Sequence, residues 1–373
     1  MLEIKPCLKI DEAIENINFI GEYIEYTPYG SGHINDTFLV RFQQSNGKIK
    51  RYILQRINHN IFKNPLQLME NIVGVTSFLK YKIKENSGDT DRETLSIIKT
   101  KEGNSFFKDS IGSYWRGYRF IENATSFNKV ETPDIFYESA IAFGHFQNLL
   151  SDYDASTLYE TIPDFHNTPI RLKALKLAIE KDKFQRVRNV EKEIEFIMKR
   201  ENETHFLMDM LKEGSLPLRV THNDTKLNNI MIDNESGKGI CIIDLDTIMP
   251  GLSVNDFGDS IRFGASTGDE DERDLSKVNL DMNLFEIYTK GFLKGCDGSL
   301  TENEIDMLPM GAKMMTIECG IRFLTDYING DNYFKIHRPE HNLDRARTQF
   351  KLVDDMEKQW EYMKSIVKEY KTI

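Results

Sequence analysis

The residues best suited to catalysis lie in one short segment, 220–230, whose sequence is VTHNDTKLNNI. His222, Asp224 and Asn229 fit the spacing His-x-Asp-x4-Asn, which is typical of loops that catalyse phosphoryl transfer. This chemistry needs a carboxylate that accepts or orients the hydroxyl group of the acceptor, and Asp224 supplies one. It also needs oxygen ligands for a metal ion on the phosphates, and the amide of Asn229 supplies one. The segment therefore predicts a phosphoryl-transfer site with Asp224 as its catalytic residue.

A second segment, 239–246, reads GICIIDLD and predicts a buried strand that ends in carboxylates. An apolar strand that delivers a carboxylate at its end is how kinases place their main magnesium ligand. Asp244 lies 20 residues after Asp224, which leaves room for a loop and a returning hairpin. Each segment alone could be an ordinary loop, but the two in tandem favour a metal site. We therefore expect Asn229 and Asp244 to bind Mg²⁺.

The string Asp256-Phe257-Gly258 also looks like a magnesium motif of protein kinases, but its context differs. It lies 32 residues after Asp224 and follows PGLSVN, which is not a strand-like sequence. We expect Asp256 to cap or brace the next helix instead. We also expect a buried His222 to hold the loop backbone by hydrogen bonds and not to act as a base.

The first third of the chain predicts a nucleotide site. Gly30 and Gly32, in the sequence YGSGHINDT, fit a hairpin turn whose backbone N–H groups approach phosphate oxygens. In the strand-like run RYILQRI, Arg56 is the candidate cation for the α- and β-phosphates, and a different register places Gln55 there instead. Glu70, on the following helix, is either the carboxylate partner of Arg56 or a surface charge.

The hydrophobic pattern changes from β-type to helical along the chain. Strand-like runs surround one helix that begins at Pro65, and they lie at 26–40, 50–57, 94–100, 105–108 and 114–121. Helical segments follow at 135–149, 170–181, 190–212, 280–292, 305–328 and 343–370. Only three short runs break this helical part, at 219–221, 229–232 and 239–245.

These patterns predict an α+β, protein-kinase-like bilobal fold with a β-rich N-lobe and a mainly helical C-lobe. We place the nucleotide-binding lobe at 1–122 and the catalytic and substrate-binding lobe at 123–373. A chain of 373 residues is about right for two packed lobes.

Composition limits the possible partners. The net charge of −11 argues against a general nucleic-acid binder, which would need a basic stripe. The four cysteines show no CxxC spacing, so neither a zinc site nor a disulfide framework is expected. The N-terminal sequence lacks the apolar core of a secretory signal, and no apolar run approaches membrane-spanning length. We expect a cytoplasmic protein with a small-molecule substrate and with no nucleic-acid or membrane partner, and its oligomeric state is left open.

Several motifs in the same order resemble the aminoglycoside phosphotransferase/choline kinase superfamily. They are the glycine hairpin, YILQRIN, the hinge sequence RFI at 119–121, THNDTKLNNIM and CIIDLDTIMPGLSVNDFGDSIRFGA. Within the superfamily the chain most resembles bacterial N-acetylhexosamine 1-kinases, through IDLDTIMPG, DFGDSIRFGA and TIPDFH. The resemblance runs from about residue 26 to residue 333, which is most of the chain.

The resemblance implies a kinase-like fold in which ATP and Mg²⁺ are used to phosphorylate a sugar. The implied acceptor is the anomeric hydroxyl of N-acetylglucosamine or N-acetylgalactosamine, and the product is the sugar 1-phosphate. Asp224 matches the catalytic aspartate of the family, and Asn229 and Asp244 match its metal ligands. Arg119 and Ile121 match the hinge beside the nucleotide.

The resemblance also implies contacts to the sugar. Arg322 and Tyr333 match an arginine and a tyrosine that contact it, and His33 and Phe263 are further candidate wall residues. A neutral sugar needs hydrogen-bond donors and an aromatic wall, and Arg322 and Tyr333 offer both. An arginine on an amphipathic helix is otherwise a surface or ion-pair residue.

Other readings differ in the acceptor or in the activity. A kinase of the same fold could act on choline, an amino alcohol, another sugar or an aminoglycoside, but the two tryptophans, Trp115 and Trp360, provide no tryptophan-rich cage for choline. A non-catalytic nucleotide-binding scaffold is disfavoured because no catalytic or metal-ligating residue is lost. A protein kinase is disfavoured because no activation segment that ends in Ala-Pro-Glu follows Asp244. The choice between ATP and GTP, the anomer and the number of Mg²⁺ ions are left open.

Overall fold

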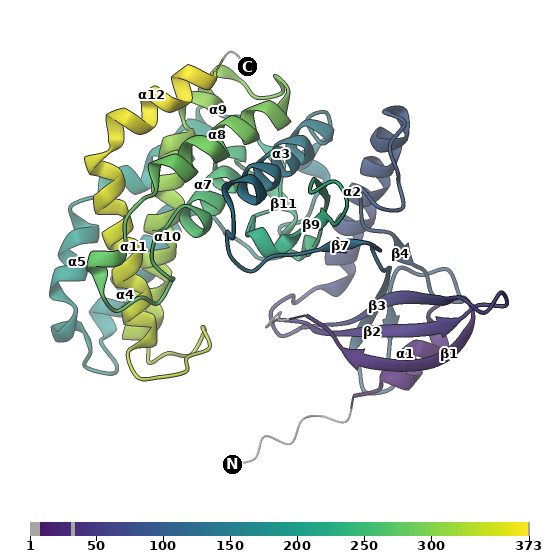
Figure 1. Cartoon of the computed structure of the whole chain (residues 1–373). Helices are drawn as coiled ribbons and strands as arrows, with labels where there is room; N and C mark the ends of the chain where they lie inside the picture. The colour runs from purple at the N-terminus through teal and green to yellow at the C-terminus, as the bar shows by residue number, and fades with distance from the viewer. Residues whose placement is uncertain (1–7, 31–33, 372–373) are drawn as a thin grey trace.

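The computed structural model describes residues 8–30 and 34–371. A β-sheet region near the N-terminus lies beside a larger helical region (Figure 1). We call residues 8–122 the N-lobe and residues 123–371 the C-lobe. Two residues of the predicted site, Gly32 and His33, lie outside the described residues.

The strands are β1 (Glu22–Pro28), β2 (Asp36–Gln43), β3 (Ile49–Ile57), β4 (Ile97–Ile98), β5 (Phe107–Lys108), β6 (Tyr114–Arg119), β7 (Ala124–Thr125), β8 (Arg219–Thr221), β9 (Ile230–Asp233), β10 (Gly239–Ile242) and β11 (Met249–Gly251). The α-helices are α1 (Ile10–Asn16), α2 (Pro65–Glu85), α3 (Pro133–Leu149), α4 (Thr168–Lys181), α5 (Glu191–Met198), α6 (Phe206–Lys212), α7 (Ser253–Gly264), α8 (Met282–Cys296), α9 (Glu302–Asp306), α10 (Leu308–Ile328), α11 (His341–Lys358) and α12 (Trp360–Tyr370).

The N-lobe is an antiparallel sheet with the strand order β1-β2-β3-β6-β4, and β5 also pairs with β6. The predicted pairing of the two hairpin strands is confirmed, because Tyr26 in β1 pairs with Val40 in β2, while most of the predicted glycine turn lies outside the described residues. Side chains alternate between the two faces of a strand. On one face Val40 and Leu54 pack against α1, and on the other Ile57 joins the main core together with α2.

Helix α2 begins where the sequence predicts, with Pro65 in its first turn and the side chain of Asn64 accepting a hydrogen bond from Gln67 N. It lies between the sheet and the C-lobe (Figure 1). Asn71, on its buried side, donates hydrogen bonds to the carbonyl oxygens of Tyr159 and Ile248 at 2.8 and 3.0 Å. The amide therefore attaches this N-lobe helix to the C-lobe.

The C-lobe is helical around a few short strands, so the predicted α+β class and its division into a β-rich and a helical part are confirmed. Helix α3 packs against α8, and α10 packs against both α7 and α11. The strands β9 and β10 form an antiparallel hairpin, and β8 pairs with β11. Among the described helices, none combines the length and the apolar character needed to cross a membrane.

Two predicted helices are each divided in the structure, and helices α1 and α7 were not predicted. The segment 190–212 becomes α5 and α6, because the chain turns at Arg200, whose guanidinium binds Glu357 of α11. The segment 343–370 becomes α11 and α12, which meet at Gln359. Helix α7 is almost wholly buried and carries polar residues on its buried surface, so its sequence shows no clear apolar stripe. Only short parts of the predicted strands 94–100 and 105–108 are paired, as β4 and β5.

Helices α7 and α10 approach closely because glycines face each other. A Cβ atom at Gly258 would lie 2.3 Å from the carbonyl oxygen of Gly311, and one at Gly311 would lie 2.1 Å from that of Val254. Each contact is with helix backbone, which cannot move aside as a side chain can. This contact holds α7 next to the loop that contains His222 and Asn223.

We predict that Gly258→Ala destabilises the protein. Alanine favours a helix over glycine by about 1 kcal/mol, but overpacking a core costs about 1–3 kcal/mol, and a backbone neighbour puts the cost at the upper end. The free energy of unfolding should therefore fall by about 1–2 kcal/mol in chemical denaturation. Ser77→Ala, at an exposed position of α2, is the control and should change it by less than about 0.5 kcal/mol. A more stable Gly258→Ala protein would contradict the close packing.

Candidate active site

The catalytic loop lies between β8 and β9, and the hairpin β9–β10 returns the chain beside it. Ile230 pairs with Ile242 across this hairpin. Just beyond it, Ile243 N donates a hydrogen bond to the carbonyl oxygen of Asn229 at 2.9 Å. Asn229 and Asp244 are therefore next to each other although 15 residues separate them in the sequence.

Asp224 is held by two neighbours in the loop. Asn229 Nδ2 donates to Asp224 Oδ2 at 3.0 Å and to its carbonyl oxygen at 2.8 Å, and Lys226 Nζ lies 2.9 Å from Oδ1. Burial alone would raise the pKa of Asp224, but Lys226, His222 and Asn229 outweigh it and lower the pKa. Asp224 is therefore ionised at neutral pH and can accept a hydrogen bond from a hydroxyl group.

Asp244 follows β10 in a left-handed conformation, with φ 57° and ψ 58°. Asp244 is exposed to solvent, although neighbouring protein atoms partly desolvate its carboxylate. This desolvation and the charges of Asp246 and Asp224 raise the pKa of Asp244 to about 7. The site therefore holds negative charge that the protein itself does not neutralise, which fits a bound cation.

No three acidic, histidine or cysteine side chains converge into a preformed metal cage within the described ranges. That fits Mg²⁺ in a kinase, because Mg²⁺ is usually held by one or two protein carboxylates together with phosphate oxygens and water. Asn229 and Asp244 offer the oxygen ligands that such a site needs.

Helix α7 supports the catalytic loop from below. The Asp256 carboxylate accepts the backbone N–H groups of His222 at 2.9 Å and of Asn223 at 2.8 Å, and it also accepts Gln147 Nε2 at 2.7 Å. Asp256 is only 2% exposed. Asp256 lies inside α7 and braces the loop, whereas the sequence context predicted that it would cap or brace the next helix. His222 is also buried, with Nε2 2.9 Å from the carbonyl oxygen of Ile243.

The sequence analysis missed two further supports from α7. Asp259 accepts the backbone N–H of Thr225 at 3.1 Å, and Ser260 Oγ donates to the carbonyl oxygen of Thr225 at 2.7 Å. Their spacing from Asp256 puts all three on one face of the helix, which is the signal that could have identified them.

A buried cation from the N-lobe also reaches the segment that follows β10, and it was not predicted from the sequence. Arg116 on β6 is only 1% exposed, and its guanidinium lies 2.5 Å from Asp246 Oδ1. It also donates to Gln55 Oε1 at 3.0 and 3.1 Å. Asn35 Nδ2 donates to the other oxygen of Asp246 at 2.5 Å. These contacts connect the sheet to the segment that follows Asp244.

The structure does not bring Arg56 and Glu70 together. Arg56 pairs with Asp36 on the adjacent strand, with Nε 2.7 Å from Oδ2, and it shares the sheet face that packs on α1. Gln55, the alternative in the sequence analysis, points to the opposite face and binds Arg116. Glu70 is exposed on α2. The predicted ion pair between Arg56 and Glu70 is therefore wrong. Neighbouring strand residues face opposite sides of the sheet, and Arg56 faces the side that packs on α1.

The hairpin and the hinge meet at the edge of the N-lobe. Tyr29 packs edge-on against Phe120, with ring centroids 5.8 Å apart. Gly30 has φ 79°, a conformation that glycine adopts readily, and a Cβ there would touch nothing within 4 Å. At the hinge, Arg119 forms an ion pair with Asp91, and Ile121 is buried in the core.

On the acceptor side, Arg322 and Tyr333 are connected through Phe334. The Arg322 guanidinium lies 5.3 Å from the ring centre of Phe165 and 5.4 Å from that of Phe334. The ring of Tyr333 packs against Phe334 at 4.7 Å, and 63% of Tyr333 is exposed. Phe263 lies half-buried near the end of α7.

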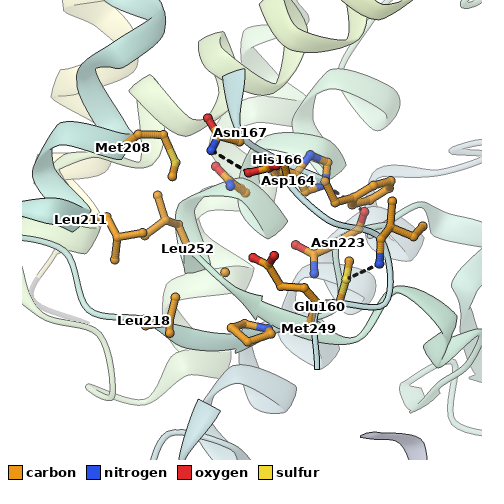
Figure 2. Close-up of a pocket in the computed structure, with 15 residues that line it drawn as sticks. Glu160, Asp164, His166, Asn167, Met208, Leu211, Leu218, Asn223, Met249 and Leu252 are labelled. Carbon is orange, nitrogen blue, oxygen red and sulfur yellow. Dashed lines mark hydrogen bonds between the residues drawn. The ribbon is translucent and has the colours of Figure 1, made fainter. Parts of the chain in front are cut away.

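A cavity of about 90 Å³ borders the loop at Asn223 (Figure 2). Its other walls come from residues 160–167, α6, β11 and the start of α7. Ligand pockets are usually about 300–1,000 Å³. The cavity is therefore too small for a sugar or a nucleotide.

Asp224, Asn229 and Asp244 lie together in one segment of the C-lobe. Residues 109–279, which carry all three, match the model of the phosphotransferase enzyme family (APH). This segment is therefore similar to the members of that family.

Solved structures with the same fold include three kinases. An aminoglycoside phosphotransferase from Alicyclobacillus acidocaldarius is 10% identical with a TM-score of 0.62, covering 97% of this chain and 96% of its own. An amicoumacin kinase in complex with AMP-PNP, Ca²⁺ and its ligand is 12% identical with a TM-score of 0.56, covering 92% of each chain. A choline kinase from Cryptosporidium parvum is 15% identical with a TM-score of 0.54, covering 94% of this chain and 93% of its own.

We predict that Asp256→Ala destabilises the protein, since it leaves the backbone N–H groups of His222 and Asn223 buried without partners. One such group costs about 1–3 kcal/mol, so the free energy of unfolding should fall by about 2–4 kcal/mol. Asp269→Ala removes an exposed carboxylate that pairs with Lys129 and should have almost no effect. Unchanged stability together with a higher Mg²⁺ requirement would instead identify Asp256 as a metal ligand.

Proposed function

We propose that the protein transfers the γ-phosphoryl group of ATP, with Mg²⁺, to the anomeric hydroxyl of an N-acetylhexosamine. The observation that carries the phosphotransferase part is the contact between Asp224 and Asn229, with Asp244 beside them, in the segment that matches the family. The amicoumacin kinase complex with AMP-PNP supports a nucleotide as donor.

The site residues divide the work of phosphoryl transfer. The Asp224 carboxylate orients the acceptor hydroxyl and accepts its proton as the new P–O bond forms. Asn229 and Asp244 would hold Mg²⁺, which neutralises charge on the phosphates when bound. Lys226, next to Asp224, adds a positive charge where negative charge moves during the transfer.

The charges on the acceptor side favour a neutral acceptor. Arg322 presents a rigid set of donors between two aromatic rings, and the exposed ring of Tyr333 lies near it. The pKa of Arg171 is lowered, first by burial and then by Arg322, which shows that two cations lie close together here. Quaternary ammonium and polycationic acceptors would be repelled by them. Hydroxyl and acetamido oxygens of a neutral amino sugar would instead accept hydrogen bonds from the arginines.

We predict that N-acetylglucosamine or N-acetylgalactosamine is phosphorylated and that their methyl glycosides, which lack the free anomeric hydroxyl, are not. The measurement is the mass of the product after incubation with ATP and Mg²⁺, for these sugars together with choline, ethanolamine and an aminoglycoside. Asp224→Asn is the control and should reduce turnover by about a hundredfold or more. A phosphorylated methyl glycoside would refute anomeric phosphorylation, and product from choline alone would move the protein to another acceptor class.

We predict that Arg322→Ala lowers kcat/KM for the sugar by about ten- to a hundredfold, because a charged donor to a buried hydroxyl is lost. The KM for ATP should stay within about twofold. Arg322→Lys keeps the charge but loses the planar donor set, so it should also be impaired. Arg273→Ala removes an exposed arginine and serves as the control. An equal loss of ATP binding in Arg322→Ala would contradict an acceptor role.

A further inference from the structure

His166 is a buried residue that the proposed reaction does not use. It lies in the segment between η1 (Ala155–Thr157) and α4, and its side chain is 8% exposed. Its Nδ1 lies 2.8 Å from Glu318 Oε1 on α10, and its Nε2 lies 3.1 Å from the carbonyl oxygen of Asn223. Figure 2 shows His166 and Asn223 at the same small cavity. The imidazole therefore connects helix α10 with the residue immediately before Asp224.

The partners of His166 determine its protonation state. A backbone carbonyl oxygen can only accept, so Nε2 must carry a hydrogen. The carboxylate of Glu318 accepts as well, and its second oxygen already accepts Thr168 Oγ1 at 2.9 Å. Nδ1 must therefore carry a hydrogen too. An imidazole that makes both contacts is an imidazolium.

The surrounding charges are compatible with an imidazolium. Burial lowers the pKa of His166 and Arg322 lowers it slightly, but Glu318 and the carbonyl of Asn223 raise it above its ordinary value of 6.5. Asp256 on α7 also interacts with His166. The pKa of Glu318 is correspondingly lowered, because His166, Arg322 and Arg171 outweigh the effect of its burial.

Asn223 needs the support that His166 gives. The residue has φ 64°, in the left-handed region, which asparagine adopts more readily than most other non-glycine residues. Its N–H is bound by Asp256, its Oδ1 accepts Thr221 Oγ1, and its Nδ2 donates to the carbonyl oxygens of Thr221 and Thr247. Within the described structure the remaining polar group, the backbone carbonyl, is bound only by His166.

We propose that His166 is a positioning residue whose imidazolium bridges Glu318 and the Asn223 carbonyl and thereby sets the orientation of Asp224. The same bridge couples the catalytic loop to the acceptor side, because Glu318 and Arg322 lie one turn apart on α10. This coupling rests on the proposed function. The protonated bridge itself does not, because it follows from the contacts of His166.

Two substitutions separate the two hydrogen bonds of His166. In His166→Asn the amide nitrogen takes the place of Nδ1, so the donor to Glu318 is kept and the donor to Asn223 is lost. In His166→Gln the amide nitrogen takes the place of Nε2, so the donor to Asn223 is kept. We expect kcat to fall about tenfold or more in His166→Asn and less than about threefold in His166→Gln, with the KM for ATP within about twofold in both.

Thermal unfolding of both variants distinguishes positioning from a merely structural role. If both variants lower Tm but keep the kcat of the wild type, the positioning role is refuted. If His166→Gln loses as much kcat as His166→Asn, the bond to the Asn223 carbonyl is not the important one, and the proposal is again refuted.

Nitrogen NMR of the imidazole tests the bridge without any acceptor. In the wild-type protein at pH 7 we expect both ring nitrogens of His166 to be protonated, with the signal assigned by its absence in His166→Gln. One unprotonated ring nitrogen would overturn the proposal. If no acceptor is phosphorylated, the proposed function fails, and this spectrum still decides the state of His166.

The pH dependence of stability gives a second readout without an acceptor. Since the pKa of His166 is raised on folding, the ion pair stabilises the protein fully below about pH 6.5. Its contribution is lost as the pH rises through the folded-state pKa. The difference in Tm between the wild type and His166→Gln should therefore shrink as the pH is raised from 6.5. A difference that grows with pH would refute the imidazolium.

Discussion

The catalytic loop depends on one buried carboxylate, that of Asp256, which accepts the backbone N–H groups of His222 and Asn223. The loop turns sharply just before Asp224, so these N–H groups have no partner in a helix or sheet. An unpaired N–H group in the protein interior is costly, and a charged acceptor gives a stronger bond than a neutral one. Helix α7 is in turn fixed by the close glycine contact with α10. The packing of α7 against α10 therefore determines the position of Asp224.

Charge is arranged in two regions around Asp224. On one side Asp244 and Asp246 add negative charge, of which the guanidinium of Arg116 neutralises only part. A cation and a triphosphate together would complete this side. On the other side Arg322 provides positive charge beside aromatic rings. In the proposed reaction the charged donor and the neutral acceptor would approach Asp224 from these two different environments.

The fold class could be predicted from the sequence, and the proposed centre of the site could be located there, because both depend on local patterns. Asp224 lies in a contiguous loop motif, and Asp244 ends a recognisable apolar strand. The cation of the N-lobe was missed, because the partners of Gln55 and Arg56 depend on strand register, and a shift of one residue exchanges the two faces of a sheet. Arg116 lies on a strand some 60 residues further along the chain, where no local motif marks it.

In the proposed function, contacts between distant segments would couple acceptor binding to catalysis through one rigid element. Helix α10 carries Glu318 and Arg322 on adjacent turns. Glu318 reaches the catalytic loop through His166, although Glu318 and His166 are 152 residues apart in the sequence. A helix transmits a displacement along its length because its backbone hydrogen bonds keep neighbouring turns in register. A sugar that binds Arg322 and shifts α10 would therefore also affect Asn223, because α10 contacts Asn223 through Glu318 and His166. The N-lobe is attached to the C-lobe through the apolar packing of Ile57 and α2 and through polar side chains such as Asn71 and Arg116. Nucleotide and acceptor would thus reach Asp224 through separate sets of contacts, so that a substitution in one set should leave binding in the other largely intact.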